Sequence, residues 1–259
     1  MWRRGFLELA VGATVLAGCD RPLRARAPDP GAVPGEIRAV AFDLFTLFDP
    51  RGVDRRVAEL LPAPEEVKRE FAAAWKGRLF QYSWIRTASG RYLDFERLVH
   101  DSLLHACRTH GVRLDPGLGR RLESAFTELE PWPDTLDVLA ALRARGLRLA
   151  PLANFSPRMI EGLLEHGGAR HFFDAIISTD RARTYKPDPR AYALGEQVFG
   201  LPRGQIAFSA FGGWDAAGAR WFGYPTFWVN RLGVPAEELI QPDATGPDLT
   251  HLARWLPMG

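Results

Sequence analysis

One stretch decides the fold, Ile37-Arg38-Ala39-Val40-Ala41-Phe42-Asp43, a short apolar run that ends in an acid. A run of this kind is typical of a strand that is buried on both faces of a parallel sheet. Such a strand delivers Asp43 to the carboxyl edge of the sheet, where open α/β sheets bind their ligands. Asp43 is therefore the first candidate for a functional residue.

Outward from this strand, the chain after residue 130 alternates between helical and extended patterns. Helices are predicted over 134–145, 157–166, 188–199 and 214–222, and strands over 147–152, 174–178, 205–210 and 225–229. Alternation of this kind indicates a parallel sheet with right-handed crossovers. We therefore predict an α/β fold with a Rossmann-like parallel sheet core.

Between residues 51 and 130 the pattern is helical throughout, with helix starts at Pro64, Asp94 and Pro116. This block lies between the first and second predicted strands, so it is an insertion that can cover the strand ends. The prediction is a core formed by residues 37–50 and 131–259, with an inserted α-helical cap at 51–130.

The first residues have the features of an export signal. The run from Leu9 to Ala17 is far shorter than the ~20 residues that a membrane-spanning helix needs. Arg3-Arg4-Gly5-Phe6-Leu7 resembles a twin-arginine signal, and Leu16-Ala17-Gly18-Cys19 resembles a bacterial lipobox whose cysteine is lipidated. We predict an export signal over 1–19 and a Pro- and Arg-rich tether over 20–36. The protein would then be periplasmic or a membrane-anchored lipoprotein, in contact with the membrane only through Cys19. The alternative is an uncleaved N-terminus on a cytoplasmic protein.

Length and composition exclude several classes of protein. With 259 residues, of which 46% are hydrophobic, the chain is long enough to bury a full core. Its formal net charge of +2 argues against nucleic acid as a partner. Its two cysteines, Cys19 and Cys107, are too few for a disulfide scaffold or for a zinc site of their own.

Four polar side chains follow the ends of predicted strands: Asp43, Asn154, Lys186 and Asp215. In a parallel sheet these ends meet at one crevice. A carboxylate there can act as a covalent nucleophile, a lysine beside it keeps it ionised, and a second acid can help to deliver water to an ester. Single acids and lysines at strand ends are more often surface caps, but the order and spacing of this set favour an active site.

Four segments that carry these residues resemble the motifs of the haloacid dehalogenase superfamily, and more narrowly of the type II (S)-2-haloacid dehalogenases. They are Phe42-Asp43-Leu44-Phe45-Thr46-Leu47-Phe48-Asp49, Leu152-Ala153-Asn154, Tyr185-Lys186-Pro187-Asp188 and Trp214-Asp215. The cap run from Trp75 to Phe95 and the run from Trp214 to Pro225 are similar along their whole lengths. The resemblance covers about residues 37–232.

The resemblance implies a hydrolase in which Asp43 attacks the halogen-bearing carbon of a small 2-substituted carboxylic acid. Water then hydrolyses the aspartyl ester to a 2-hydroxy acid, with no metal and no other cofactor. Asp43, Lys186 and Asp215 are the implied catalytic residues. The implied substrate-binding residues are Thr46, Lys76, Phe80, Phe95, Asn154, Tyr192 and Trp214. A homodimer is a further option, since members of the family are commonly dimers.

The chain also departs from the family's pattern. The turn after Asp43 is one residue short, because Phe45 is followed directly by Thr46 and the family's glycine is missing. Lys76 replaces an arginine, Ala153 and Ala210 replace serines, and Gly212 replaces an asparagine. These losses keep open an exported binding protein that retains the fold without turnover. A magnesium phosphatase is disfavoured, because Phe45 stands where phosphatases place a second aspartate; a phosphatase or phosphonate-type hydrolase is the third alternative.

Overall fold

A computed structural model describes residues 36–257, which all belong to one compact unit, Gly31–Gly259. The predicted export signal, Cys19 and the tether up to residue 35 lie outside the described residues. Among the helices of residues 36–257, none combines the length and the apolar character needed to cross a membrane.

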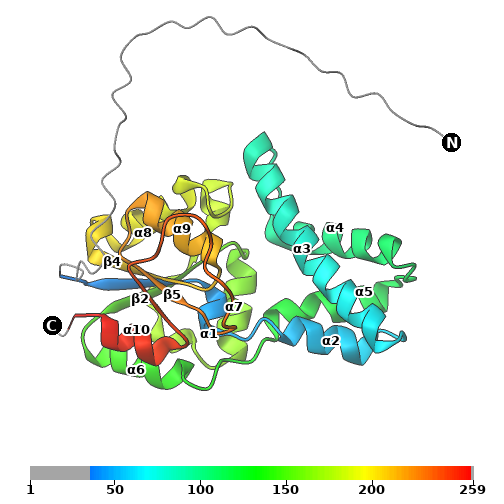
Figure 1. Ribbon diagram of the computed structural model, residues 1–259, viewed down its shortest axis with the longest axis horizontal. Coiled ribbons are helices and arrows are strands. Elements are labelled where there is room, and N and C mark those ends of the chain that lie inside the picture. Colours follow the sequence, from blue (N-terminus) through cyan, green and yellow to red (C-terminus); the bar gives the residue numbers. More distant parts are fainter. Residues whose placement is uncertain (1–35, 258–259) are drawn as a thin grey trace, which may run out of the picture. The chain divides into compact units, whose positions relative to one another are not determined.

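The core is a parallel sheet that, within residues 36–257, has six strands in the order β3-β2-β1-β4-β5-β6 (Figure 1). The strands are β1 (Ala39–Phe42), β2 (Arg148–Ala153), β3 (Ile177–Ser178), β4 (Ile206–Ala210), β5 (Thr226–Val229) and β6 (Ala244–Gly246). Strand β1 lies at the centre, where Phe42 is paired with Pro151 of β2 and Ser209 of β4. The strand order reverses at β1, so the carboxyl end of β1 opens into the crevice where such sheets bind ligands.

Helices cover both faces of the sheet. Side chains of β1 alternate, since Val40 and Phe42 pack into one buried cluster and Ala39 and Ala41 into another. Helices α6 (Thr135–Ala144), α7 (Pro157–His166) and α10 (Leu249–Trp255) contribute to the first cluster, and α8 (Pro189–Phe199) and α9 (Gly213–Phe222) to the second. All four residues of β1 are fully buried, as expected for a strand covered on both faces.

A helical insertion lies between β1 and α6, on the side of the sheet where β1 leads into α1 (Figure 1). Its elements are α2 (Gly52–Leu60), α3 (Glu65–Ser89), α4 (Phe95–Thr109), α5 (Pro116–Glu123) and the 3-10 helix η1 (Ser124–Thr127). Local sequence fixes its helix ends. The Asp94 side chain accepts a hydrogen bond from the backbone of Arg97 at the start of α4, and Gly90 ends α3 with a φ of 64°.

The predicted α/β class with a parallel sheet is confirmed, and most elements predicted after residue 130 occur with boundaries that differ by at most one residue. Strand β3 is shorter than predicted. The Asp174 carboxylate accepts a hydrogen bond from Leu149 N at 2.9 Å and occupies a backbone donor at that level of the sheet. Strand β6, helix α10 and the short helix α1 (Leu44–Leu47) were not predicted. Three further 3-10 helices are η2 (Arg170–Phe172), η3 (Thr179–Ala182) and η4 (Arg203–Gln205).

Candidate active site

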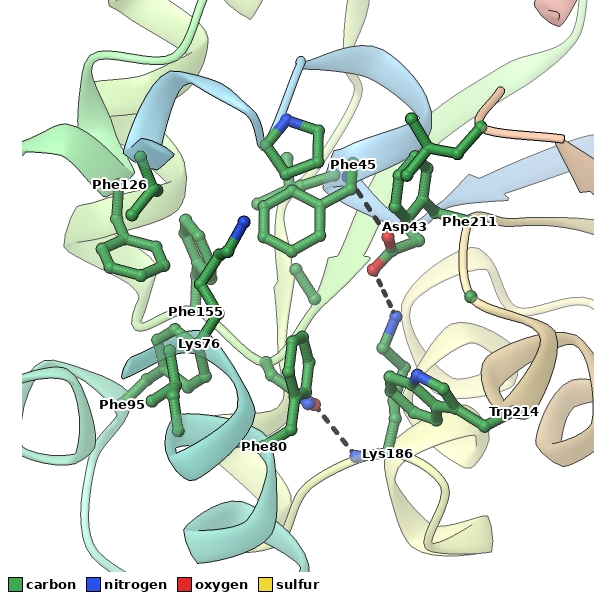
Figure 2. A pocket seen from close by; sticks show the side chains of 18 residues that line it. Asp43, Phe45, Lys76, Phe80, Phe95, Phe126, Phe155, Lys186, Phe211 and Trp214 are labelled. Carbon is green, nitrogen blue, oxygen red and sulfur yellow. Dashed lines mark hydrogen bonds and ion pairs between the residues drawn. The ribbon is translucent and has the colours of Figure 1, made fainter. Parts of the chain in front are cut away.

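A cavity of about 280 Å³ lies at the carboxyl ends of the strands, lined by both core loops and the helical insertion (Figure 2). The lining residues from the core are Asp43, Leu44, Phe45, Pro50, Ala153, Asn154, Phe155, Lys186, Phe211, Gly212, Trp214 and Leu232. Those from the insertion are Val53, Lys76, Leu79, Phe80, Phe95 and Phe126. Most of these side chains are apolar, and many are aromatic.

Asp43 occupies the junction between β1 and α1. Its backbone N donates to Ser209 O at 2.9 Å, which continues the pairing of β1 with β4. Its side chain caps α1, because Oδ2 accepts from Phe45 N at 3.2 Å. The side chain is 15% exposed and lines the cavity. The carboxylate is thus held at the end of a rigid strand with one face open to a ligand.

Lys186 links this carboxylate to a second one. Its Nζ donates to Asp43 Oδ1 at 2.7 Å and to Asp215 Oδ2 at 2.8 Å, and its side chain is only 1% exposed. Burial opposes the charge of the ammonium, but the carboxylates of Asp215 and Asp43 outweigh burial and raise the pKa of Lys186 above its ordinary value. Lysine is therefore held protonated between two acids.

Asp215 lies in the first turn of α9, beneath the cavity floor and fully buried. Its Oδ1 accepts a hydrogen bond from the Tyr192 hydroxyl at 2.7 Å. Burial raises the pKa of Asp215 to about 6; Lys186 opposes this rise, and the nearby charge of Asp43 adds to it. One ammonium is shared between two carboxylates, so the carboxylate buried more deeply holds its proton to a higher pH than a free aspartate does.

Asn154 fixes the loop that carries Lys186. Its Oδ1 accepts hydrogen bonds from Lys186 N at 2.9 Å and Thr179 Oγ1 at 3.4 Å. These bonds tie the end of β2 to the segment that follows β3. Since Oδ1 is engaged on the protein side, Nδ2 is the carboxamide atom that can donate to a ligand in the cavity.

On the insertion side, Lys76 of α3 and Asp54 of α2 form an ion pair of 2.6 Å at the cavity. The two side chains are 30% and 40% exposed. Phe80 packs against Trp214 with ring centroids 5.8 Å apart. The Trp214 indole also lies directly over Gly212, because a Cβ at Gly212 would be 2.7 Å from Trp214 Nε1. Glycine at 212 thus makes room for the indole.

The structure brings both Asp43 and Asp215 into direct contact with Lys186. Of the other predicted site residues, Lys76, Phe80, Phe95, Asn154 and Trp214 line the cavity. Thr46 and Tyr192 do not. Thr46 is fully buried and its hydroxyl donates to Asp43 O at 2.7 Å, so it supports the turn from behind. Tyr192 lies beneath Asp215.

Sequence reasoning missed the aromatic lining that the core supplies. Phe155 follows Asn154, Phe211 precedes Gly212, and Phe45 stands two residues after Asp43, yet none was predicted to line the site. Because these phenylalanines stand next to motif residues in the sequence, their position could have indicated that they line the site. Asp54 was also missed, because nothing in the sequence indicates that α2 faces α3 at Lys76. Within residues 36–257, no three His, Cys, Asp or Glu side chains gather in a way that could hold a metal ion.

The parallel sheet presents a carboxylate, a lysine and a second acid beneath helices that are inserted after the first strand. This arrangement defines a class of α/β hydrolases. The chain matches the profile of the haloacid dehalogenase-like hydrolases over residues 37–223, and it belongs to this family. It is 42% identical over 209 residues to an (S)-2-haloacid dehalogenase of Pseudomonas sp. (strain YL), covering 80% of this chain and 89% of that protein.

A second relative and a solved structure that resemble the chain are also dehalogenases. Haloacetate dehalogenase H-2 of Moraxella sp. (strain B) is 37% identical over 214 residues, with 82% of this chain and 94% of that protein covered. The L-2-haloacid dehalogenase of Xanthobacter autotrophicus, solved with chloropropionic acid covalently bound, superposes with a TM-score of 0.78 at 30% identity, over 84% of this chain and 97% of that one. The chain is therefore a haloacid dehalogenase-like hydrolase of the L-2-haloacid dehalogenase type, as its motifs predicted.

Proposed function

We propose that the protein hydrolyses 2-haloacids to 2-hydroxy acids through an ester on Asp43. The observation that carries the proposal is the position of Lys186 Nζ, 2.7 Å from Asp43 and 2.8 Å from Asp215. A protonated lysine keeps the Asp43 carboxylate ionised and therefore nucleophilic. The names of the relatives support the reaction, since they are dehalogenases of 2-haloacids and of haloacetate.

In the first step, a carboxylate oxygen of Asp43 attacks the carbon that bears the halogen. A carbon–oxygen bond forms, the carbon–halogen bond breaks, and the configuration of that carbon inverts. The halide leaves with the bonding electron pair toward the insertion side, where Lys76 is the cation that lines the cavity. Asn154 Nδ2 and the Trp214 indole are the donors proposed to orient the substrate carboxylate.

In the second step, water attacks the ester carbonyl of Asp43, and Asp215 takes the proton of the water. The ester carbon–oxygen bond breaks on the aspartate side, and Asp215 passes its proton to the departing oxygen, so the 2-hydroxy acid keeps the inverted configuration. Asp43 releases the second proton of the water and regains its carboxylate. Tyr192 holds Asp215 through Oδ1 while Lys186 holds it through Oδ2. Thr46 contributes from behind, by fixing the carbonyl of Asp43.

The direct test is to incubate the full chain with each enantiomer of 2-chloropropionate and to measure chloride. A single turnover in isotopically labelled water should give unlabelled lactate and a labelled Asp43 peptide, because the product oxygen comes from the aspartate. The Asp43→Asn variant should release no chloride and form no ester. Absence of chloride with both enantiomers, together with an unmodified Asp43 peptide, would remove the proposal.

A second candidate function is an exported binding protein without turnover. Two observations favour it. Lys76 is already paired with Asp54, and Ala153, Ala210 and Gly212 provide no side-chain donors at the positions where the family pattern has them. Under this reading, wild type and Asp43→Asn bind a 2-hydroxy acid with equal affinity and neither releases chloride. Halide release by the wild type alone would reject it.

We further propose that residues 1–19 direct export and that Cys19 carries the lipid. The support is the sequence pattern, since these residues lie outside the described part of the chain. Expression in a bacterial host followed by intact-mass analysis would show a processed, lipidated N-terminus. A Cys19→Ala variant serves as the control, since it should lose the lipid and leave the membrane fraction.

A further inference from the structure

We propose that this site selects acids whose 2-substituent is bulky, apolar and preferably aromatic, in place of the smallest 2-haloacids. The inference rests on the proposed function for its chemistry and deepens it by naming the substrate class. It comes from the aromatic walls of the cavity, from its volume and from the state of its charged groups.

Three phenylalanines from three separate core segments, Phe45 of α1 and Phe155 and Phe211 of loops, meet beside Asp43 (Figure 2). The ring of Phe45 lies 5.9 Å from that of Phe155 and 5.9 Å from that of Phe211, in both cases edge to face. Phe155 in turn stacks on Phe95 of the insertion, with ring centroids 4.9 Å apart. Edge-to-face and stacked contacts of this kind extend readily to one more ring, because aromatic faces and edges attract each other.

The cavity has room for such a ring. Its volume of about 280 Å³ exceeds the roughly 150 Å³ in which an apolar protein cavity can hold benzene. It also comes close to the roughly 300 Å³ at which pockets for drug-sized ligands begin. A two- or three-carbon haloacid would leave much of this space to water against apolar walls, which is unfavourable.

The charged groups at the cavity are already paired. Lys186 is bound by Asp43 and Asp215, and Lys76 by Asp54. The substrate carboxylate therefore meets no free lysine among the lining residues, so it gains less from charge pairing than from neutral donors. More of the binding free energy must then come from burying the 2-substituent, at about 25 cal/mol per Å² of apolar surface.

The test compares (S)-2-chloropropionate with (S)-2-chloro-3-phenylpropionate as substrates of the full chain. It also compares the affinities of (R)-lactate and (R)-3-phenyllactate by calorimetry. We expect kcat/KM to be at least about tenfold higher for the phenyl acid and phenyllactate to bind at least about tenfold more tightly, since even one methylene in an apolar pocket is worth about tenfold or more. Equal values, or a preference for the smaller acid in both measurements, would overturn the inference.

Variants separate the aromatic wall from general effects on folding. Phe211→Ala and Phe211→Leu should each reduce the phenyl preference about fivefold or more, with the leucine variant as a check in case alanine loosens the loop. Trp221→Ala is the matched control, because Trp221 is an aromatic side chain that is 61% exposed and lies outside the cavity lining. Its preference should equal that of the wild type.

The affinity measurement needs no turnover, so the two proposals fail separately. Tighter binding of phenyllactate without chloride release from either acid would reject the dehalogenase proposal and keep the aromatic selectivity. Chloride release from both acids with equal kcat/KM and equal affinities would keep the dehalogenase proposal and reject the aromatic selectivity.

Discussion

Lys186 holds two carboxylates at the centre of the site, and both the ammonium and Asp215 are buried. Removing one partner of such a group leaves a buried charge without compensation, which typically costs about 3–5 kcal/mol of stability. We expect Lys186→Met to lower the free energy of unfolding by about this amount and to abolish chloride release. Chemical denaturation at pH 7 would measure the first effect.

The matched control for this variant is Lys76→Met. Its ion pair with Asp54 is partly exposed, so it should contribute no more than about 1 kcal/mol. The loss in Lys186→Met should also grow as pH rises. Lys186 lowers the pKa of Asp215, so removing it raises that pKa above the value of about 6 in the parent protein. The variant therefore loses more stability than the parent as pH rises, because the buried Asp215 must ionise without its partner. Equal losses in the two lysine variants would contradict this account.

The elevated pKa of Asp215 also predicts a pH profile. As a base toward water, Asp215 must be ionised, so ester hydrolysis should slow as pH falls through its pKa. In the ester that pKa lies below about 6, because esterified Asp43 no longer carries the charge that raises it. Attack by Asp43 is a separate step, and the Asp43 ester should therefore accumulate at low pH. Mass spectrometry of the Asp43 peptide after quenching at pH 5 and pH 8 would measure this. Ester levels that do not depend on pH would exclude Asp215 as the base.

For single residues, the sequence predicted which side chains meet at the strand ends better than it predicted which way each side chain faces. The carboxyl ends of parallel strands must meet, so Asp43, Asn154, Lys186 and Asp215 could be placed together from their positions alone. Whether a side chain near them faces the cavity depends on packing. Thr46 turns inward because its hydroxyl bonds to Asp43 O, and no periodicity in the sequence contains that information.

At the scale of elements, the short helix α1 is held by donors from distant segments. Phe45 O accepts from Trp132 Nε1 at 3.0 Å, and Thr46 O accepts from Arg231 Nε and Nη2 at 3.1 and 2.9 Å. Leu47 O accepts from Thr135 Oγ1 at 2.7 Å. A helix of one turn cannot satisfy its own carbonyls, so these side chains complete the shortened turn behind Asp43.

Among the side chains that hold α1, Arg231 can be tested by a substitution that keeps its charge. Arg231→Lys keeps the charge but loses the planar fork that reaches both Thr46 O and the Asp134 carboxylate. We expect kcat for chloride release to fall about tenfold, with a smaller change in KM, because Asp43 is less well positioned. Arg145→Lys is the matched control, since Arg145 likewise donates to carbonyls, at the end of α10. A kcat equal to that of Arg145→Lys would argue against a positioning role.

Helices α8 and α9 approach each other at a glycine. A Cβ on Gly218 would lie 2.5 Å from the Tyr192 hydroxyl and 2.7 Å from Pro187 Cβ. Gly218→Ala should therefore destabilise the protein by about 1–3 kcal/mol and reduce activity, because it displaces Tyr192 and the loop of Lys186. Gly162→Ala in α7, with nothing within 4 Å of the new methyl group, should be neutral or stabilising. Thermal unfolding would measure the stabilities of both variants, and equal stabilities would contradict the packing argument.

Two of the three elements that the sequence did not predict, α1 and β6, share one property. Helix α1 and strand β6 are four and three residues long, too short for a helical or alternating pattern to be visible. They form because tertiary contacts supply what local sequence does not: donors from Trp132 and Arg231 for α1, and pairing with β5 for β6. Longer elements such as α7 were predictable, since their apolar faces repeat over several turns.

At the scale of the whole described unit, the insertion is tied to the core by more than its two connecting segments. The Tyr92 hydroxyl donates to Oδ1 of Asp180, a residue of η3, at 2.6 Å. Glu96 of α4 accepts from the Ser156 hydroxyl at 2.8 Å and forms an ion pair of 3.1 Å with Arg158 at the start of α7. The loop before α4 thus docks on the same core segments that surround Asn154 and Lys186.

These links should control how readily the cavity opens, because Phe80 and Phe95 of the insertion form one of its walls. Each hydrogen bond contributes about 1 kcal/mol, so the double variant Tyr92→Phe and Glu96→Ala, which removes both the donor and the acceptor, should favour opening by about 2 kcal/mol. We expect hydrogen exchange in the first turn of α4 to become at least about tenfold faster, and KM to rise more than kcat falls. Tyr82→Phe is the control, since its ring packs within the insertion against His105. Exchange in the double variant that matched this control would show that the docking contacts do not hold the cavity closed.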